Sequence, residues 1–186
     1  MKELVYIILC VSLFSCKQKV GGQLILHAEN KQLSTQNGVL YYYDTPFSGT
    51  LKVFDEVNQT KNAANYSNGK KEGEEKKWFV NDSVAEIRFY KEGLKVGIHK
   101  SWWKNGQQKF EYPYNNNGVY HGAFKEWYAS GQLVREFHYH NGREKGTQKM
   151  WLANGNIRAN YTVIDNERFG LIGLKKCYSV KTKDEK

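Results

Sequence analysis

Lysine and tryptophan recur together along this sequence at a fixed spacing. Four Lys-x-Trp units follow one another at intervals of 24 or 25 residues. Residues two apart on a β-strand point to the same side, so each unit would place an ammonium group beside a ring. Such a strip could hold an anionic ligand through lysine charge and ring stacking. The candidate ligand-binding residues are Lys76, Lys100, Lys125 and Lys149 with Trp78, Trp102, Trp127 and Trp151.

A purely structural interpretation of the same pattern remains open. A lysine stem can cover a neighbouring ring while its ammonium group stays in water, which is common on exposed sheets. The sequence does not choose between a binding strip and a solvated face.

Other residue patterns offer weaker chemistry. His138 and His140 lie two apart and could begin a metal site, but neither a cysteine nor a carboxylate cluster completes it. Glu111 and Glu136 share one position of the repeat, and acid–base catalysis would require a pocket and shifted pKa values there. The glycines fit turns rather than a phosphate-binding loop. We therefore expect no catalytic residue, no metal and no cofactor.

Glycines set the period that must position these residues. An aromatic residue stands five positions after each of the first five lead glycines, and a second aromatic residue usually stands 17 positions after them. Turn signals, often Asn-Gly, fall near positions eight and nine and again before the next lead glycine, and Asn-Gly is typical of type I′ hairpin turns. Two turns per cell predict a continuous antiparallel meander. The lead glycines are Gly49, Gly73, Gly97, Gly122, Gly146 and Gly170.

The predicted fold class is all-β: an elongated single-layer antiparallel sheet of stacked β-hairpin repeats, with about five cells of 24 residues. At about 4.8 Å per strand, five cells span about 50 Å. If the tight turns preserve facing, the Lys-Trp units share one aromatic face with pairs such as Tyr112 and Tyr114. We expect the extra residue of the one longer cell within residues 115–118.

Residues 97–107 and 122–133 resemble the bacterial variant of the MORN repeat, and the resemblance covers residues 39–170. It implies an array of β-hairpins forming an elongated, curved single sheet. Many bacterial members carry the label of antitoxin-like repeat protein, so the resemblance specifies fold better than function. Asn58-Gln59 and Asn81-Asp82 depart from the Asn-Gly pattern, which predicts longer or looser turns there.

The first 16 residues resemble a bacterial lipoprotein signal peptide. A lysine near the start precedes an apolar run, and Leu13-Phe14-Ser15-Cys16 is similar to a lipobox, although Phe14 is bulkier than usual. The resemblance implies cleavage before Cys16 and lipidation of its sulfur. An ordinary secretory signal or a short membrane anchor is the alternative, since the run is shorter than the roughly 20 residues that span a bilayer.

The remaining chain divides into three predicted parts. Residues 17–38 form a tether and N-terminal cap, residues 39–170 the repeat array, and residues 171–186 a C-terminal cap strand with a disordered tail. Cys177 would be the one free thiol of the mature lipoprotein, and a small packed hydrophobe is its more usual role than an intermolecular disulfide.

Net charge and export together suggest the class of partner. The chain has 28 Lys and Arg against 19 Asp and Glu, a formal charge of +9, which favours anionic partners. An exported lipoprotein would meet protein or glycan rather than nucleic acid. We therefore expect a non-catalytic scaffold, lipid-anchored in the bacterial cell envelope on its periplasmic or outer-membrane face, that binds a protein or envelope glycan.

Two alternative functions follow from other features. An antitoxin-like protein would bind and mask a toxin in the cytoplasm, but an export signal argues against it. An envelope hydrolase would require a pocket, which a single curved sheet hardly offers.

Overall fold

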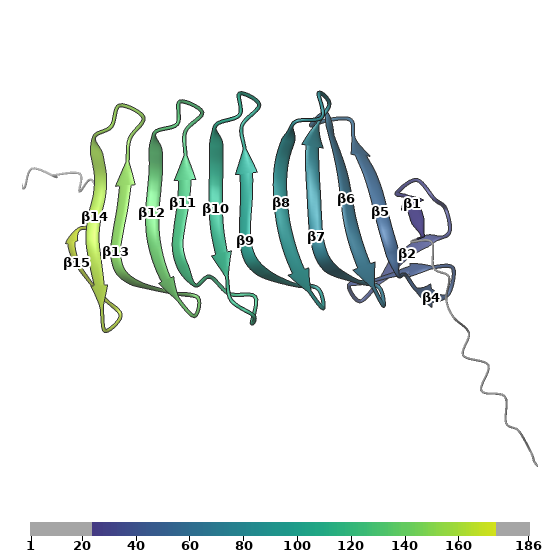
Figure 1. Cartoon of the computed structure of the whole chain (residues 1–186). Coiled ribbons are helices and arrows are strands. Elements are labelled where there is room, and N and C mark those ends of the chain that lie inside the picture. The colour runs from purple at the N-terminus through teal and green to yellow at the C-terminus, as the bar shows by residue number, and fades with distance from the viewer. Residues whose placement is uncertain (1–23, 174–186) are drawn as a thin grey trace, which may run out of the picture.

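Residues 24–173 of the computed structural model are described here, and they fold entirely as β-structure. An open sheet of 12 strands is accompanied by a separate sheet of three strands. Figure 1 shows the large sheet as one elongated layer with strands arranged in chain order. The predicted fold class is confirmed. The expected signal peptide with Cys16, the first residues of the tether, and Cys177 with the tail lie outside the described residues.

From β5 to β15, each strand of the large sheet pairs with the next strand in the chain, forming consecutive hairpins. The neighbours are antiparallel, except that β1 lies parallel to β5. The strands are β1 (Ile25–His27), β5 (Gly49–Asp55), β6 (Thr60–Ser67), β7 (Lys70–Phe79), β8 (Val84–Lys91), β9 (Leu94–Trp102), β10 (Gln108–Tyr114), β11 (Gly122–Trp127), β12 (Leu133–His140), β13 (Arg143–Trp151), β14 (Ile157–Ile164) and β15 (Glu167–Leu171).

The small sheet closes the N-terminal end of the array. It consists of β2 (Leu33–Gln36), β3 (Val39–Tyr42) and β4 (Thr45–Pro46). It docks on the β6–β7 turn, where Leu40 N–H donates to the Gly69 carbonyl at 2.8 Å and Gly69 N–H donates to the Phe47 carbonyl at 2.7 Å. The Phe47 ring is buried, with its centroid 5.8 Å from that of Tyr66. The cap thus packs against Tyr66, the first tyrosine of the repeats.

Each of the first five lead glycines bends its strand and faces a side chain of its own repeat. Gly73, Gly97 and Gly146 have φ values of 75°, 68° and 75°, in the left-handed region where side chains are disfavoured. A ring opposite a glycine can cover the surface that the missing side chain leaves free. The directly opposed pairs are Gly49 with Tyr66, Gly73 with Tyr90, Gly97 with Tyr114, Gly122 with Tyr139, and Gly146 with Val163.

The turns at the two ends of the hairpins differ. In Asn68-Gly69, Glu92-Gly93 and Asn141-Gly142 both residues have positive φ, as a type I′ turn requires. At the opposite end, Asn105-Gly106, Ser130-Gly131 and Asn154-Gly155 have positive φ at the glycine alone. The first of these turns is closed by the Trp103 N–H donating to the Gln107 carbonyl at 2.8 Å, which leaves a three-residue loop. The type I′ prediction is confirmed at one end and wrong at the other.

The extra residue of the longer cell lies where the sequence predicts it. Asn115 N–H donates to the Val119 carbonyl at 3.0 Å, closing a three-residue loop in place of a two-residue type I′ turn. The neighbouring strands keep their register because the additional residue is accommodated in this surface turn.

The predicted sharing of one face by tryptophans and tyrosines is wrong. Lys100, three positions after its lead glycine, lies opposite Glu111, 14 positions after it. Directly opposed residues share a face of the sheet, and here an odd repeat position lies opposite an even one. The odd positions of the first strand therefore share a face with the even positions of the second strand. Tyr112 and Tyr114 therefore lie opposite to the face that carries Lys100. We call the side that carries the four Lys-x-Trp units the lysine face and the other side the tyrosine face.

The tyrosine face contains most of the buried side chains. Phe124 is 4% exposed, and its ring stacks on that of Tyr112 with centroids 4.1 Å apart and planes 12° apart. The Arg135 guanidinium lies 4.9 Å from the centre of the same ring. The tryptophans of the lysine face are only half-buried, and in residues 24–173 no tryptophan ring contacts another aromatic ring. Ring packing across strands therefore belongs to the tyrosine face.

Gly73→Ala tests the requirement for left-handed backbone. A Cβ at Gly73 would meet nothing within 4 Å, so the cost arises from φ alone, about 1 kcal/mol. We expect a lower melting temperature by circular dichroism. Gly173→Ala is the matched control, because Gly173 also has open space and lacks a positive φ. Equal melting of the two variants would contradict this explanation.

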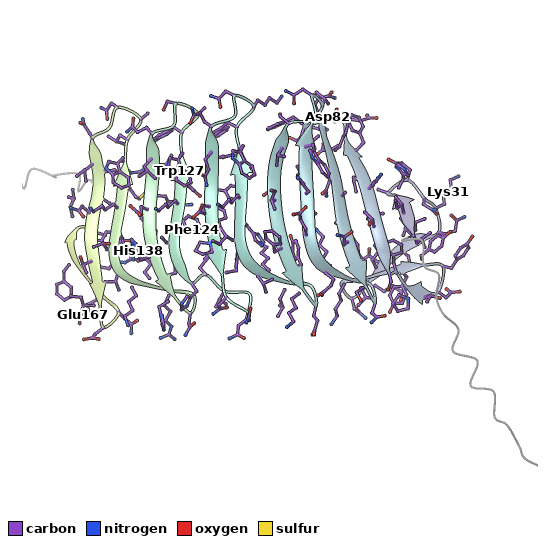
Figure 2. The ribbon with its side chains drawn as sticks, in the orientation of Figure 1. Lys31, Asp82, Phe124, Trp127, His138 and Glu167 are labelled. Atoms are coloured by element: carbon purple, nitrogen blue, oxygen red, sulfur yellow. The ribbon has the colours of Figure 1, made fainter. Side chains whose placement is uncertain are left out.

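Phe124→Ala and Trp127→Ala compare the two faces within one strand. Figure 2 shows Trp127 nearer the turn end of β11 and Phe124 nearer its middle. Truncating a buried phenylalanine costs about 3 kcal/mol or more, whereas a half-buried tryptophan loses fewer contacts. Urea denaturation should show the larger loss of unfolding free energy for Phe124→Ala. A larger loss for Trp127→Ala would contradict the conclusion that the tyrosine face stabilises the sheet.

Candidate functional site

A single cross-strand row contains the predicted lysines. Directly opposed residues follow each other from β5 to β14 without interruption, lysines alternating with other side chains. The row reads Lys52, Ala63, Lys76, Ile87, Lys100, Glu111, Lys125, Glu136, Lys149 and Asn160. The structure therefore aligns all four predicted lysines and adds Lys52 to them.

Two glutamates of this row form ion pairs with neighbouring lysines. Lys100 Nζ lies 3.2 Å from Glu111 Oε2, and Lys125 Nζ lies 3.2 Å from Glu136 Oε1. Both pairs are partly exposed, so each contributes little stability, but each neutralises a lysine. Glu111 and Glu136, the carboxylates considered for catalysis, are thus ion-pair partners of the lysines.

The other predicted lysines have different surroundings. Among residues 24–173, neither Lys76 nor Lys149 forms an ion pair. Lys76 lies between Ala63 and Ile87 in the row, and its Nζ is 5.7 Å from the centre of the Trp78 ring. Lys149 lies opposite Glu136 on one side and Asn160 on the other. Free positive charge is therefore greatest towards the N-terminal half of the row.

The aromatic members of the units form a second row nearer the turns. Phe54 and Trp78 both lie opposite Lys61, one on each side. Trp102, Trp127 and Trp151 lie opposite Gln108, Leu133 and Ile157 respectively. These aromatic rings lie apart from one another and do not stack.

The lysine face is hollowed where the two rows pass over β5, β6 and β7. The hollow has a volume of about 540 Å³ and opens to solvent. Its lining combines rings with cations and includes one carboxylate, that of Asp82, which lies at the turn end of the β7–β8 hairpin (Figure 2). The lining residues are His27, Lys52, Val53, Phe54, Lys61, Asn62, Ala63, Trp78 and Asp82.

A second hollow, of about 670 Å³, lies near the turns and is lined by residues of mixed charge. Lys77, Lys104 and Lys109 line it together with Glu86. Glu86 is already bound by Arg88, with Nη2 and Oε1 2.6 Å apart, and Lys109 lies 4.5 Å from the centre of the Trp103 ring. Glu86 and Lys109 therefore already have partners within the protein.

The histidines do not assemble a metal site in the described part of the chain. His138 Nδ1 lies 2.7 Å from the Thr147 carbonyl, and His140 packs against His121 with ring centroids 4.8 Å apart. Between residues 24 and 173, no group of three potential ligands converges.

Polar groups on the tyrosine face are linked into a network. Arg135 holds Glu126 through two bonds of 2.6 and 2.7 Å, and the Tyr112 hydroxyl donates to the same carboxylate. Burial, together with this carboxylate, raises the pKa of Tyr112 well above its usual value. Burial also raises the pKa of Tyr90 to about 12. These phenols stay protonated at neutral pH and serve as hydrogen-bond donors.

Of the residues that line the first hollow, only Trp78 is among the predicted ligand-binding residues. Lys52 and Phe54 belong to the same periodic series as the predicted lysines and tryptophans, although they are not among the predicted ligand-binding residues. Ala63 gives no local signal, because it matters only through its register opposite Lys52 and Lys76. His27 reaches the hollow because β1 pairs with β5 out of the repeat order.

Comparison with known proteins assigns neither a family nor a function to the chain. No protein-family model matches the chain, and no curated protein matches it. The MORN-like resemblance stays a prediction. Among residues 24–173, a helix of the length and apolarity that a membrane span requires does not occur.

His99 is a buried titratable group on the tyrosine face, only 2% exposed. Its Nε2 lies 2.9 Å from the Phe89 carbonyl, which can only accept, so Nε2–H donates. The ring packs between Tyr90 and Tyr114, with centroids 5.7 and 4.6 Å away. Burial lowers the pKa of His99 below its usual 6.5, outweighing the Phe89 hydrogen bond, and the charges of Arg88 and Lys95 lower it further.

This lowered pKa predicts a pH-dependent stability. The unfolded chain binds a proton at His99 more readily than the folded chain, so the stabilising contribution is complete above pH 6.5 and declines below it. We expect the melting temperature to fall between pH 7 and pH 5, and to fall less in His99→Phe, since Phe124 occupies the equivalent repeat position. Exposed His140→Phe is the control, and equal pH dependence in all three proteins would contradict the assignment.

Proposed function

We propose that this protein is a non-catalytic lipoprotein of the bacterial cell envelope that presents its lysine face to a protein or glycan partner. Lipidated Cys16 anchors it, and the repeat array acts as the scaffold. The observation that carries the proposal is the row of five lysines, alternating with other side chains, beside separated aromatic rings on one open face. Rings provide apolar contact area and lysines provide charge, the combination that suits an extended anionic partner.

A binding role accounts for the polar residues better than catalysis does. Glu111 and Glu136 neutralise half-buried lysines, and neither lines the two hollows described above. The tyrosine-face carboxylate Glu126 is held by Arg135 and Tyr112. These carboxylates have structural partners, so we propose no reaction for them.

The antitoxin-like function remains the alternative suggested by the MORN-like resemblance. It would place the protein in the cytoplasm, where Cys16 would not receive lipid. Labelled palmitate therefore separates the two proposals: the lipoprotein incorporates the label, a Cys16→Ala variant does not, and an antitoxin takes up none in either form.

Crosslinking in intact cells tests the binding role. We expect wild type to capture a partner, and the variant with Lys76, Lys100, Lys125 and Lys149 changed to Gln to capture it much more weakly. Melting should change by only a few degrees, because exposed ion pairs contribute about 0–1 kcal/mol each.

The matched control removes the same charge elsewhere. Lys70, Lys91, Lys104 and Lys145 are all exposed and lie outside the lysine row. Changing these four to Gln should leave capture close to wild type. Equal capture by both quadruple variants would mean that net charge, rather than the lysine face, determines binding.

A further inference from the structure

Six side chains form a grid over β5, β6 and β7, inside and beside the hollow of the lysine face. Each strand contributes two residues spaced two apart, which point to the same side. One row is Lys52, Ala63 and Lys76, and the other is Phe54, Lys61 and Trp78, with every neighbour directly opposed across the strands. Five of the six residues, all except Lys76, line the hollow of about 540 Å³, a volume within the size range of small-ligand sites.

The small side chain of Ala63 distinguishes this grid from the later repeats. The same repeat position holds Glu111 and Glu136, which bind Lys100 and Lys125. At Ala63 no carboxylate is available, and the methyl group leaves the floor of the hollow open. Lys52 is exposed and forms no ion pair within the described residues. The lysine charge that glutamates neutralise further along the sheet therefore remains available here.

Lys61 and Asp82 form the one ion pair at the rim. Their atoms lie 2.8 Å apart, with 50% and 78% of the side chains exposed. An exposed pair of this kind contributes little and exchanges readily with other partners. Lys52 and Lys61 both line the hollow, against this single carboxylate, and Lys76 lies directly beside Ala63, so the hollow favours an anion.

Two aromatic side chains line the hollow, at a separation that suits a ligand made of several linked rings. Phe54 and Trp78 stand on either side of Lys61, two strand spacings or about 10 Å apart. Phe54 is 46% exposed, so its apolar face is available to a ligand. His27 lies opposite Lys52 and adds a polar group at the rim.

We propose that this grid is a binding site for a short anionic oligosaccharide. Sugar rings pack on Phe54 and Trp78, and their acidic groups bind Lys52 and Lys61. The inference deepens the proposed function and rests on it, because it specifies where on the lysine face the partner binds and what its chemistry is. An acyl chain fits less well, since the hollow is open to solvent and Lys61 lies between its two rings.

Calorimetric titration of the full-length protein in detergent with tetragalacturonate tests this site. Ala63→Glu would introduce the carboxylate that pairs with lysine in later repeats, and we expect binding to weaken about tenfold or more, as for the loss of one charged hydrogen bond. Asn160→Glu is the matched control: it adds the same charge at the same repeat position beside Lys149, outside the hollow. It should bind like wild type.

Phe54→Ala provides a second test that does not depend on Ala63→Glu folding normally, since the Phe54 ring is half-exposed. It should weaken binding of tetragalacturonate but leave inorganic tetraphosphate almost unaffected. A neutral galactose tetramer should bind far more weakly than the acid.

Three results would overturn the inference. One is equal binding by Ala63→Glu and Asn160→Glu, and another is tetraphosphate binding as tightly as the acidic sugar, which would indicate charge alone. The third is wild type binding no tetragalacturonate. If crosslinking still captures a partner through the lysine face in that case, the scaffold proposal stands and only the oligosaccharide site is rejected. Loss of lysine-dependent capture would reject the scaffold proposal itself.

Discussion

A left-handed glycine opposite the side chain 17 positions later sets the geometry of every complete repeat. The glycine bends its strand, and in four of the five pairs the opposed residue is a tyrosine. Because the two residues lie directly opposite each other, this pair also determines how each hairpin is aligned. One residue of displacement would move every side chain to the other face. The repeated glycine therefore determines register as well as bending.

That register separates stabilisation from recognition. Stacked rings, the buried His99 and the Arg135–Glu126 pair lie on the tyrosine face, while lysines and isolated rings lie on the other. A thin sheet has little interior, so burying rings on one side leaves the opposite side free to vary. The lysine row shows such variation, with Ala63, Ile87, Glu111, Glu136 and Asn160 at one repeat position.

Hydrogen bonds between successive turns make the repeats one body. At one end, Gly93 and Gly142 donate to the carbonyls of Lys71 and Tyr120, 22 residues earlier. At the other end, the Asn105 amide donates to the Ala129 carbonyl at 2.7 Å, one repeat later. Each hairpin is thus tied to its neighbours at both ends as well as along its strands. Such nearest-neighbour coupling is what gives a repeat array its stability, and it keeps a surface site formed by adjacent hairpins in a constant shape.

The sequence by itself determined the period, the hairpins, the all-β class and the place of the extra residue near Asn115. These follow from local backbone preferences, such as left-handed conformation at Gly73 or Asn141-Gly142, which neighbouring residues encode directly. Only the tertiary structure decided which residues share a face, that Glu111 neutralises Lys100, and that Ala63 opens a hollow. Those properties depend on cross-strand register, which turn lengths and bulges set jointly, and an alanine gives no sign of its role until its neighbours on the adjacent strands are known.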